Sequence, residues 1–208
     1  KNRISKIVLD NFGHNLTREQ NKVLSEINED INSEQRMFRL LQGDVGSGKT
    51  VIAALATLQT IENNYQVAIM VPTEILAEQH YKNFTEWFEN TNIKIELLTG
   101  KMSAVIRKDI YQRLEEGKID ILIGTHAVFQ DKVKMKNLGL VIVDEQQRFG
   151  VKQRFDLVKK SSNQIMPHQL FMTATPIPRT LAMTIFADLD VSKIDEMPPG
   201  RKPVETLV

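Results

Sequence analysis

The sequence contains 208 residues, with 27 lysines and arginines against 26 aspartates and glutamates, so its formal net charge is +1. A chain this close to neutrality has no overall field that attracts nucleic acid or anionic membrane, so any DNA contact must be local. It has no cysteine, which excludes a disulfide framework and a cysteine-ligated metal centre.

The length and the start of the chain set expectations for domain organisation and location. A chain of this length suits a single α/β domain with a substantial core. It begins with Lys1 rather than methionine, so we expect a piece of a longer protein. It shows neither a charged-then-apolar leader nor a run of about 18 apolar residues, so we expect a soluble, cytoplasmic protein.

Six apolar runs of strand length alternate with amphipathic stretches along the chain, and each run ends in glycine, proline or a polar cluster. The runs span residues 37–43, 66–72, 93–100, 120–126, 138–145 and 169–175. Strands separated by helices predict an α/β fold with a central, mostly parallel sheet, helices on both faces and right-handed crossovers. Ligands bind beyond the carboxyl ends of such strands, so the residues that follow each run are the candidates for a site.

Between the second and third runs, apolar residues recur at the spacing of a helix face. Ala77, Tyr81, Phe84 and Phe88 are separated by four, three and four positions, which predicts a buried face for a helix within Glu74–Glu89. We interpret this face as core packing rather than as a cofactor site.

The first run is followed by GDVGSGKT, which fits the pattern G-x-x-x-x-G-K-T. Glycines let a loop turn its N–H groups inward around phosphate, and the helix after it directs its positive N-terminus at the same place. We expect Lys49 to reach the outer phosphates and Thr50 to ligate Mg²⁺. A flexible turn is the alternative, but the strand before and the helix after it favour nucleotide binding. The predicted nucleotide site comprises Gly43, Asp44, Val45, Gly46, Ser47, Gly48, Lys49 and Thr50.

The fifth run delivers two adjacent carboxylates, Asp144 and Glu145, to the carboxyl edge of the sheet. In a phosphate-loop protein such an acid holds the magnesium shell, and its neighbour can orient and deprotonate the attacking water. The alternatives are a solvated strand end and a small-molecule kinase, which would transfer phosphate to a hydroxyl. A GTPase is disfavoured because its N-K-x-D motif is absent from the sequence. The pair therefore favours hydrolysis of a nucleoside triphosphate.

Five stretches occur in the order in which superfamily 2 helicases carry their motifs. They are GDVGSGKT, MVPTEILAEQH, GTHAVF, VDEQQRFG and MTATPIPRTLA, and the resemblance runs from about Leu16 to the C-terminus. DEQQRFGV, TATPIPRT and PPGRKPV resemble the RecG family of bacterial ATP-dependent DNA helicases in particular, although the transcription-repair coupling factor shares much of this pattern. The resemblance implies a RecA-like phosphate-loop domain that uses ATP and Mg²⁺. It also implies action on branched or forked DNA in the bacterial cytoplasm, in association with the nucleoid.

The resemblance implies roles for individual residues. Lys49 would bind the β- and γ-phosphates, while Thr50 and Asp144 would hold Mg²⁺. Glu145 would activate water, and all these roles agree with the chemistry of the residues. Gln147 stands where the family usually has a histidine that links the nucleotide site to the TAT segment. Glutamine donates and accepts hydrogen bonds but cannot become cationic, so we expect the coupling to survive without an imidazolium.

Thr173, Thr175 and Arg179 fall in the segment that the resemblance connects with the coupling of hydrolysis to domain movement. The two hydroxyls follow a predicted strand, and simple strand-end capping is the alternative. Arg179 follows Pro176 and Pro178, which stiffen the turn, and a rigidly held arginine suits a phosphate or carboxylate partner. An exposed charge at the start of a helix is the alternative for this arginine.

Gln20 lies in the segment NLTREQ and has two interpretations. Thr17 followed three residues later by Gln20 is the pattern of a capping box, which needs no ligand. In the helicase family a glutamine in a similar place recognises adenine with its amide. We favour adenine recognition, because one side chain is not expected to serve both roles at once.

The resemblance also implies contacts to the DNA backbone from three segments that follow predicted strands. Hydroxyls and backbone N–H groups there can bind phosphate without reading sequence. For the histidine among them, an ordinary loop position is the alternative. The DNA candidates are Thr73, Thr99, Gly100, Thr125 and His126.

We expect one ATP-binding domain over residues 1–208, with a helical lead-in over 1–35 and the start of a linker over 190–208. Superfamily 2 motors close the ATP site with a second RecA-like domain, and arginine fingers of this kind contribute about 10³–10⁵ in turnover in related enzymes. After TATPIPRT the chain is too short for that domain, and the wedge domain that would hold a fork is also missing. We therefore expect the motor domain of a helicase that remodels branched DNA. The alternatives are the motor of the transcription-repair coupling factor and a nucleotide- and DNA-binding module with little hydrolysis of its own.

Overall fold

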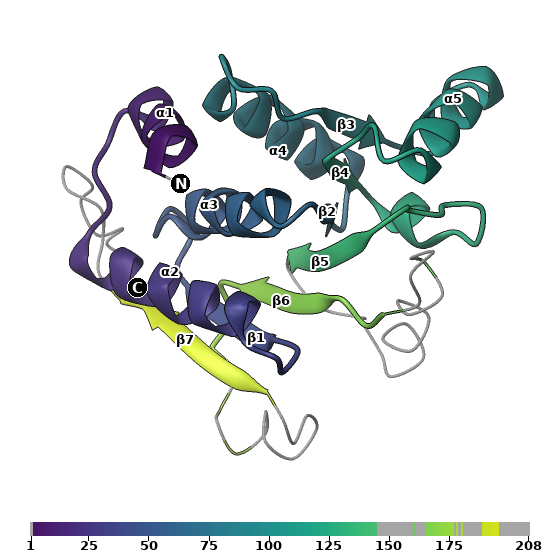
Figure 1. Cartoon of the computed structure of the whole chain (residues 1–208). Coiled ribbons are helices and arrows are strands. Elements are labelled where there is room, and N and C mark those ends of the chain that lie inside the picture. The colour runs from purple at the N-terminus through teal and green to yellow at the C-terminus, as the bar shows by residue number, and fades with distance from the viewer. Residues whose placement is uncertain are drawn as a thin grey trace, which may run out of the picture.

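The computed structural model describes residues 2–144, 160, 165–176, 178, 180 and 189–195 (Figure 1). Helices and strands alternate along most of this part of the chain. The helices are α1 (Asn2–Phe12), α2 (Arg18–Asn32), α3 (Lys49–Glu62), α4 (Glu74–Trp87), α5 (Ala104–Glu115) and the short 3₁₀ helix η1 (His126–Phe129). The strands are β1 (Phe38–Gly43), β2 (Gln66–Met70), β3 (Ile95–Leu98), β4 (Ile121–Gly124), β5 (Leu138–Asp144), β6 (His168–Thr173) and β7 (Asp190–Ile194).

The strands form one sheet of seven strands in the order β3-β4-β2-β5-β6-β1-β7. Every neighbouring pair is parallel, so the predicted α/β fold is confirmed and the sheet is parallel throughout instead of mostly parallel. Each of the six predicted runs contains a strand. Because the strands are parallel, their carboxyl ends all lie along one margin, which we call the carboxyl edge.

The seventh strand lies where we expected a linker to start. Residues 190–194 pair with β1 at the margin of the sheet, whereas residues 196–208 lie outside the described part of the chain. Ser192 and Ile194 are buried while Asp190 and Lys193 are exposed, so one side of the strand faces the core. With only two strongly apolar residues, DVSKI does not stand out in the sequence as a buried run.

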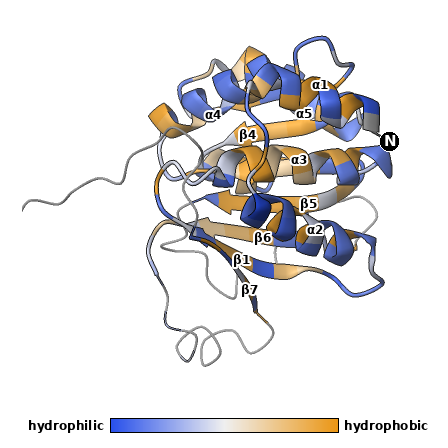
Figure 2. Ribbon diagram, turned by 90° about the vertical axis from the view of Figure 1, so that its left-hand side faces the viewer, coloured by the Kyte–Doolittle hydropathy of each residue, from blue (hydrophilic) through white to orange (hydrophobic). Residues whose placement is uncertain are grey.

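Alternate residues of each strand point to opposite faces of the sheet, and each face has its own helices. On the first face, α1, α2, α3 and α4 pack with residues such as Ile69 and Ile142. On the second face, α5 and η1 pack with residues such as Leu40 and Val141. Figure 2 shows β4 as a predominantly hydrophobic strand in the sheet behind the helices of the first face.

α3 lies at the centre of the first face, in front of the sheet in Figure 2. All residues from Val51 to Leu58 are buried, and the stretch VIAALATL contains no charged residue. A helix that is apolar on all sides is one that other elements surround. This burial fixes the loop before α3 relative to the sheet. No helix in the described residues is long and apolar enough to cross a membrane.

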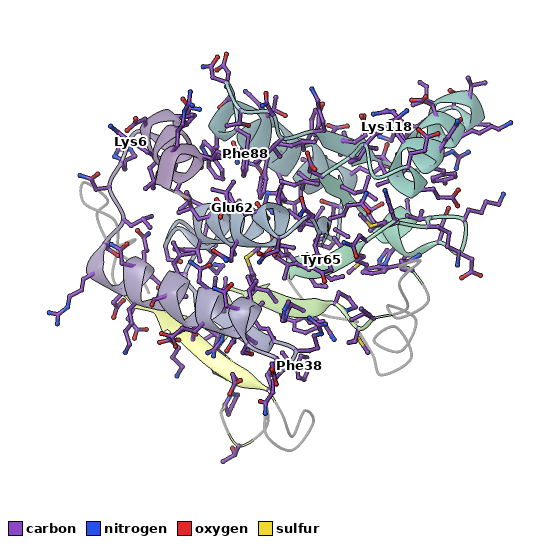
Figure 3. The ribbon with its side chains drawn as sticks, viewed as in Figure 1. Lys6, Phe38, Glu62, Tyr65, Phe88 and Lys118 are labelled. Atoms are coloured by element: carbon purple, nitrogen blue, oxygen red, sulfur yellow. The ribbon has the colours of Figure 1, made fainter. Side chains whose placement is uncertain are left out.

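The helix predicted within Glu74–Glu89 is confirmed as α4. Ala77, Phe84 and Phe88 are buried, and the rings of Phe84 and Phe88 stack with their centroids 5.8 Å apart. Figure 3 labels Phe88 at the end of this helix, beneath which α3 lies. The predicted apolar face of α4 therefore packs into the core.

Candidate nucleotide and DNA site

The loop between β1 and α3 takes its shape from two glycines. Gly46 and Gly48 have φ angles of 83° and 92°, in the left-handed region that other residues rarely adopt. Gly48 is also the N-cap of α3 and offers no side-chain hydrogen bond to the helix. The start of α3 therefore lacks a side-chain cap at the carboxyl edge, and such a helix start binds phosphate.

Two side chains of this loop test whether it fits a nucleotide. Lys49 is only 9% exposed, and its Nζ donates to the backbone oxygens of Gly43 and Asp44, the latter at 3.2 Å. Ser47 Oγ is buried without a hydrogen-bond partner from the described residues. An ammonium group and a hydroxyl beside an uncapped helix start are suitable donors for phosphate oxygens. These residues therefore fit a bound nucleoside triphosphate.

Asp144 ends β5 on the first face of the sheet, the face that α3 covers. Leu140 and Ile142, at alternate positions of the same strand, pack on that face. Thr50 lies in the first turn of α3, so both predicted Mg²⁺ ligands belong to this face at the carboxyl edge. Mg²⁺ commonly takes one or two protein ligands and completes its shell with water and phosphate oxygens. Among the described residues, no group of three or more His, Asp or Glu side chains could hold a metal ion.

The carboxylate of Asp144 also has a partner that the sequence did not reveal. Its Oδ2 lies 2.6 Å from Nε2 of His80 in α4, and both side chains are largely buried. His80 stands three residues after Ala77 and four before Phe84, so the helix spacing alone indicates that it faces the core. Its partner could not be found from sequence because the two residues are 64 positions apart.

Three predicted residues, Glu145, Gln147 and Arg179, lie outside the described part of the chain, and their roles stay predictions. Thr173 ends β6, the strand between β5 and β1. Its Oγ1 accepts a hydrogen bond from the backbone N–H of Thr175 at 3.1 Å. Strand-end capping, the alternative for each threonine, is therefore present at Thr173, and the coupling role of both threonines stays a prediction.

Gln20 forms the capping box and in addition contacts the phosphate loop. Thr17 Oγ1 accepts from the Gln20 backbone N–H at 3.2 Å, and Gln20 Oε1 accepts from the Thr17 backbone N–H at 2.9 Å. The Nε2 of Gln20 donates to the Ser47 carbonyl at 2.7 Å. The capping interpretation is confirmed, although we favoured the other one. Adenine recognition stays a prediction for a side chain that is 2% exposed.

The DNA candidates follow β3, β4 and β2, three neighbouring strands at one end of the sheet. The hydroxyl of Thr73 accepts from the backbone N–H of Leu76 at 3.3 Å and so caps α4, while its own O–H remains a donor. The exposed candidates are Thr73, Gly100 and His126. Thr125 is half-buried, and Thr99 is buried.

The strand order divides the carboxyl edge into two adjoining parts. β5, β6 and β1 carry Asp144, Thr173 and the phosphate loop, and we call this part the nucleotide side. β3, β4 and β2 carry the DNA candidates, and we call this part the DNA side. The two sides meet where β2 pairs with β5.

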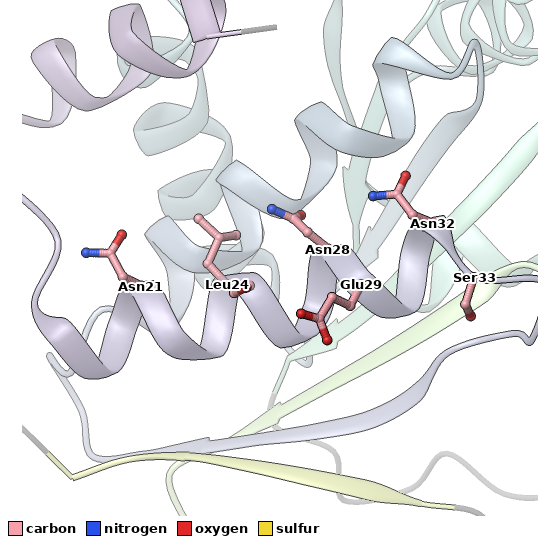
Figure 4. A pocket seen from close by; sticks show the side chains of 7 residues that line it. Asn21, Leu24, Asn28, Glu29, Asn32 and Ser33 are labelled. Carbon is pink, nitrogen blue, oxygen red and sulfur yellow. The ribbon is translucent and has the colours of Figure 1, made fainter.

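A surface hollow lies along α2 (Figure 4). None of the predicted nucleotide or DNA residues in the described part of the chain lines it. Its lining residues are Asn21, Leu24, Ser25, Asn28, Glu29, Asn32 and Ser33. The hollow is therefore separate from the predicted site.

Most of this chain has counterparts in known proteins. The sequence pattern of the DEAD/DEAH box helicase family matches residues 17–184. The chain belongs to this family. The match includes both sides of the carboxyl edge, because it extends from the capping box of α2 past β6.

Within the DEAD/DEAH box helicases, the expected resemblance to RecG is confirmed. ATP-dependent DNA helicase RecG of Aquifex aeolicus is 55% identical over 191 residues, 92% of this chain and 24% of that protein. RecG of Bacillus subtilis is 56% identical over 191 residues, 92% of this chain and 28% of that protein. A solved structure of RecG bound to a three-way DNA junction matches with a TM-score of 0.83 and 45% identity, over 97% of this chain and 27% of that one. The chain thus spans about a quarter of the length of these relatives.

Proposed function

We propose that this chain is the ATP-binding motor domain of a DNA helicase that remodels branched DNA, acting in the bacterial cytoplasm at the nucleoid. The observation that carries the proposal is the carboxyl edge, where an uncapped helix start and a buried carboxylate adjoin the strands that bear the DNA candidates. The RecG relatives named above support the same function. Fork reversal and branch migration of four-way junctions are the expected forms of this remodelling.

The proposed chemistry is hydrolysis of ATP bound with Mg²⁺. Lys49 would leave the carbonyls of its own loop and bind the outer phosphates, a change that exchanges neutral acceptors for charged ones. Thr50 and Asp144 would hold Mg²⁺, which supplies neutralisation of charge on the phosphates. Glu145 would orient and deprotonate the attacking water.

We also propose that residues 1–208 form one RecA-like domain of a longer motor, with a second RecA-like domain and a wedge domain elsewhere in the protein. A second domain would supply the arginine finger, whose absence lowers turnover by about 10³–10⁵ in related enzymes. The isolated chain should therefore bind ATP and hydrolyse almost none.

The test is steady-state ATP hydrolysis with and without forked DNA, measured on the full-length protein and on this chain alone. We expect forked DNA to stimulate hydrolysis by the full-length protein, and the chain alone to bind MgATP with nearly no turnover. Lys49→Ala serves as the matched blank and should weaken MgATP binding at least about tenfold, because it removes a charged phosphate ligand.

Two results would contradict the proposal. Unchanged MgATP affinity in Lys49→Ala would remove the phosphate-loop assignment. Robust DNA-stimulated turnover by the isolated chain would show that it completes its own active site, which would exclude the proposed division of labour between two domains.

A further inference from the structure

One contact joins the two sides of the carboxyl edge through a helix. His80 of α4 and Asp144 of β5 approach to 2.6 Å between Nε2 and Oδ2, with side chains 9% and 11% exposed. His80 Nδ1 is buried and has no hydrogen-bond partner from the described residues. The ring therefore has one polar partner in this part of the chain, the carboxylate of Asp144.

The chemistry of the pair fixes which atom donates. An ionised carboxylate only accepts hydrogen bonds, so His80 Nε2–H is the donor and Asp144 Oδ2 the acceptor. The bond uses one of the two carboxylate oxygens and leaves Oδ1 outside it. The buried ring of His80 thus fixes the rotamer of Asp144 and, with it, the direction of Oδ1. Partners of this kind orient metal-binding carboxylates, and their loss typically costs about 10–100-fold in metal affinity or activity.

The position of His80 in α4 gives the contact a second consequence. α4 begins directly after Thr73, an exposed DNA candidate that caps the helix. His80 follows seven residues later, a distance of about 10 Å along the helix axis. Between them α4 is one continuous helix, and Ala77 is buried in the core. A displacement of the helix start by DNA would therefore move the histidine that holds Asp144.

We propose that His80 is a positioning residue that aligns Asp144 for the Mg²⁺ of bound ATP and links this carboxylate to the DNA side through α4. The proposal rests on the proposed function, since it requires that Asp144 binds Mg²⁺ and that α4 meets DNA. It assigns no proton transfer to the histidine.

The decisive variants are His80→Met and His80→Gln in the full-length protein. The two side chains have the same length and similar volume, but only glutamine places an N–H donor the same number of bonds from Cα as Nε2 of histidine. Lys82→Met is the control, because it places the same side chain at an exposed position of the same helix. Thermal melting confirms that each variant is folded.

The first measurement is the affinity for ATP with and without Mg²⁺, which needs no turnover. We expect the gain in ATP affinity on adding Mg²⁺ to be about tenfold smaller in His80→Met than in the wild type. Its ATP affinity without Mg²⁺ should stay within about twofold of the wild type. His80→Gln and Lys82→Met should retain the gain within about threefold. The second measurement is DNA-stimulated kcat, which should fall about 10–100-fold in His80→Met at an unchanged DNA Kd.

The outcomes distinguish failure of this inference from failure of the proposed function on which it rests. A wild type whose ATP affinity does not depend on Mg²⁺ would overturn the proposed function and this inference together. With an Mg²⁺-dependent wild type, a His80→Met variant that matches it would overturn the inference alone. Equal losses in the methionine and glutamine variants would do the same, because they would show that ring shape and not the donor matters. If His80→Met does not fold, loss of the Mg²⁺-dependent gain in a folded His80→Gln would still overturn the inference, and its retention would support it.

Discussion

At Gln20, a single side-chain amide joins the start of α2 to the phosphate loop. Its oxygen completes the capping box with Thr17, and its nitrogen donates to the carbonyl of Ser47. Glycine at position 48 leaves room for this contact, because a Cβ at that position would lie 2.2 Å from Gln20 Nε2. The glutamine therefore supports the loop whether or not it also reads adenine.

Two alanine variants separate the roles of the capping box. Thr17→Ala should cost about 1 kcal/mol of stability through the lost cap and leave nucleotide affinity nearly unchanged. Gln20→Ala should cost a similar amount and also weaken ATP binding several-fold, because the Ser47 carbonyl loses its donor. Urea unfolding and ATP and GTP affinities measured on both variants check this. Equal nucleotide affinities in the two variants would contradict a role for Gln20 in the loop, and a change in ATP-over-GTP preference in Gln20→Ala alone would support adenine recognition.

Residue chemistry that depends on neighbours in sequence could be predicted, and chemistry that depends on distant segments could not. The glycines and lysine of the phosphate loop have a fixed local spacing, so their roles could be read directly. The capping box is also local, and its pattern predicts it as one of two alternatives for Gln20. The bond between His80 and Asp144 joins a helix to a strand, and no local pattern encodes it.

At the scale of elements, His168 joins the amino ends of β6 and β1. Its Nδ1 accepts a hydrogen bond from the backbone N–H of Met37 at 2.8 Å. Burial, and then the positive charge of Arg36, lowers the pKa of the His168 imidazole to about 4. The folded chain therefore keeps this ring neutral, with a lone pair directed at the start of β1.

The lowered pKa predicts acid sensitivity in a defined range of pH. Well above pH 6.5 the ring is neutral in both states, and this contribution to stability is complete. As the pH falls from about 6.5 to about 4, the unfolded chain takes up a proton that the folded chain resists, so stability declines. We expect a loss of about 2 kcal/mol from this residue after allowance for screening.

Urea unfolding at pH 7 and pH 4.5 checks this expectation, with His168→Asn as the matched variant. The Asn oxygen can replace Nδ1 as the acceptor for Met37, but an amide does not titrate in this range. The wild type should lose more stability than the variant between the two pH values. Parallel losses would assign the acid sensitivity to other groups.

β7 shows which element could not be predicted and why. Besides its backbone pairing with β1 and the buried Ile194, it is held by polar side chains, because Arg39 of β1 donates to Ser192 at 3.0 Å and to Asp30 of α2 at 2.7 Å. Ser192 in turn donates to Glu26 of α2 at 2.5 Å. Apolar periodicity finds strands that bury side chains on both faces. It does not detect a short edge strand whose side chains are held by polar hydrogen bonds.

At the scale of the whole molecule, the strand order separates the two kinds of binding residue. The alternation of strands and helices predicts a parallel sheet and places the candidates that follow strands at the carboxyl edge. It does not give the order β3-β4-β2-β5-β6-β1-β7, which depends on the side to which each crossover turns. That order brings β3, β4 and β2 together as the DNA side and leaves nucleotide binding to the other strands.

This separation predicts that DNA binding can be weakened without any change in nucleotide binding. Gly100 is exposed on the DNA side, and apart from the residues next to it in the chain, a Cβ there would have only Glu74 Oε1, at 3.8 Å, within 4 Å in the described residues. Gly100→Asp therefore introduces a negative charge with little steric effect, and Gly100→Asn is the neutral control of the same size. If this position lies against a DNA phosphate, the aspartate variant should bind forked DNA about tenfold more weakly at low salt than the asparagine variant.

The salt dependence then distinguishes repulsion from a change of shape. Screening shortens the range of the charge–phosphate interaction, so the difference in Kd between the two variants should shrink as salt rises from 50 to about 300 mM. ATP affinity should be the same in both variants, because Gly100 follows β3 on the DNA side and the phosphate loop follows β1 on the nucleotide side. Equal DNA affinities for Asp and Asn at low salt would place the DNA backbone away from Gly100 and would move the DNA side of the site to the loops after β2 and β4.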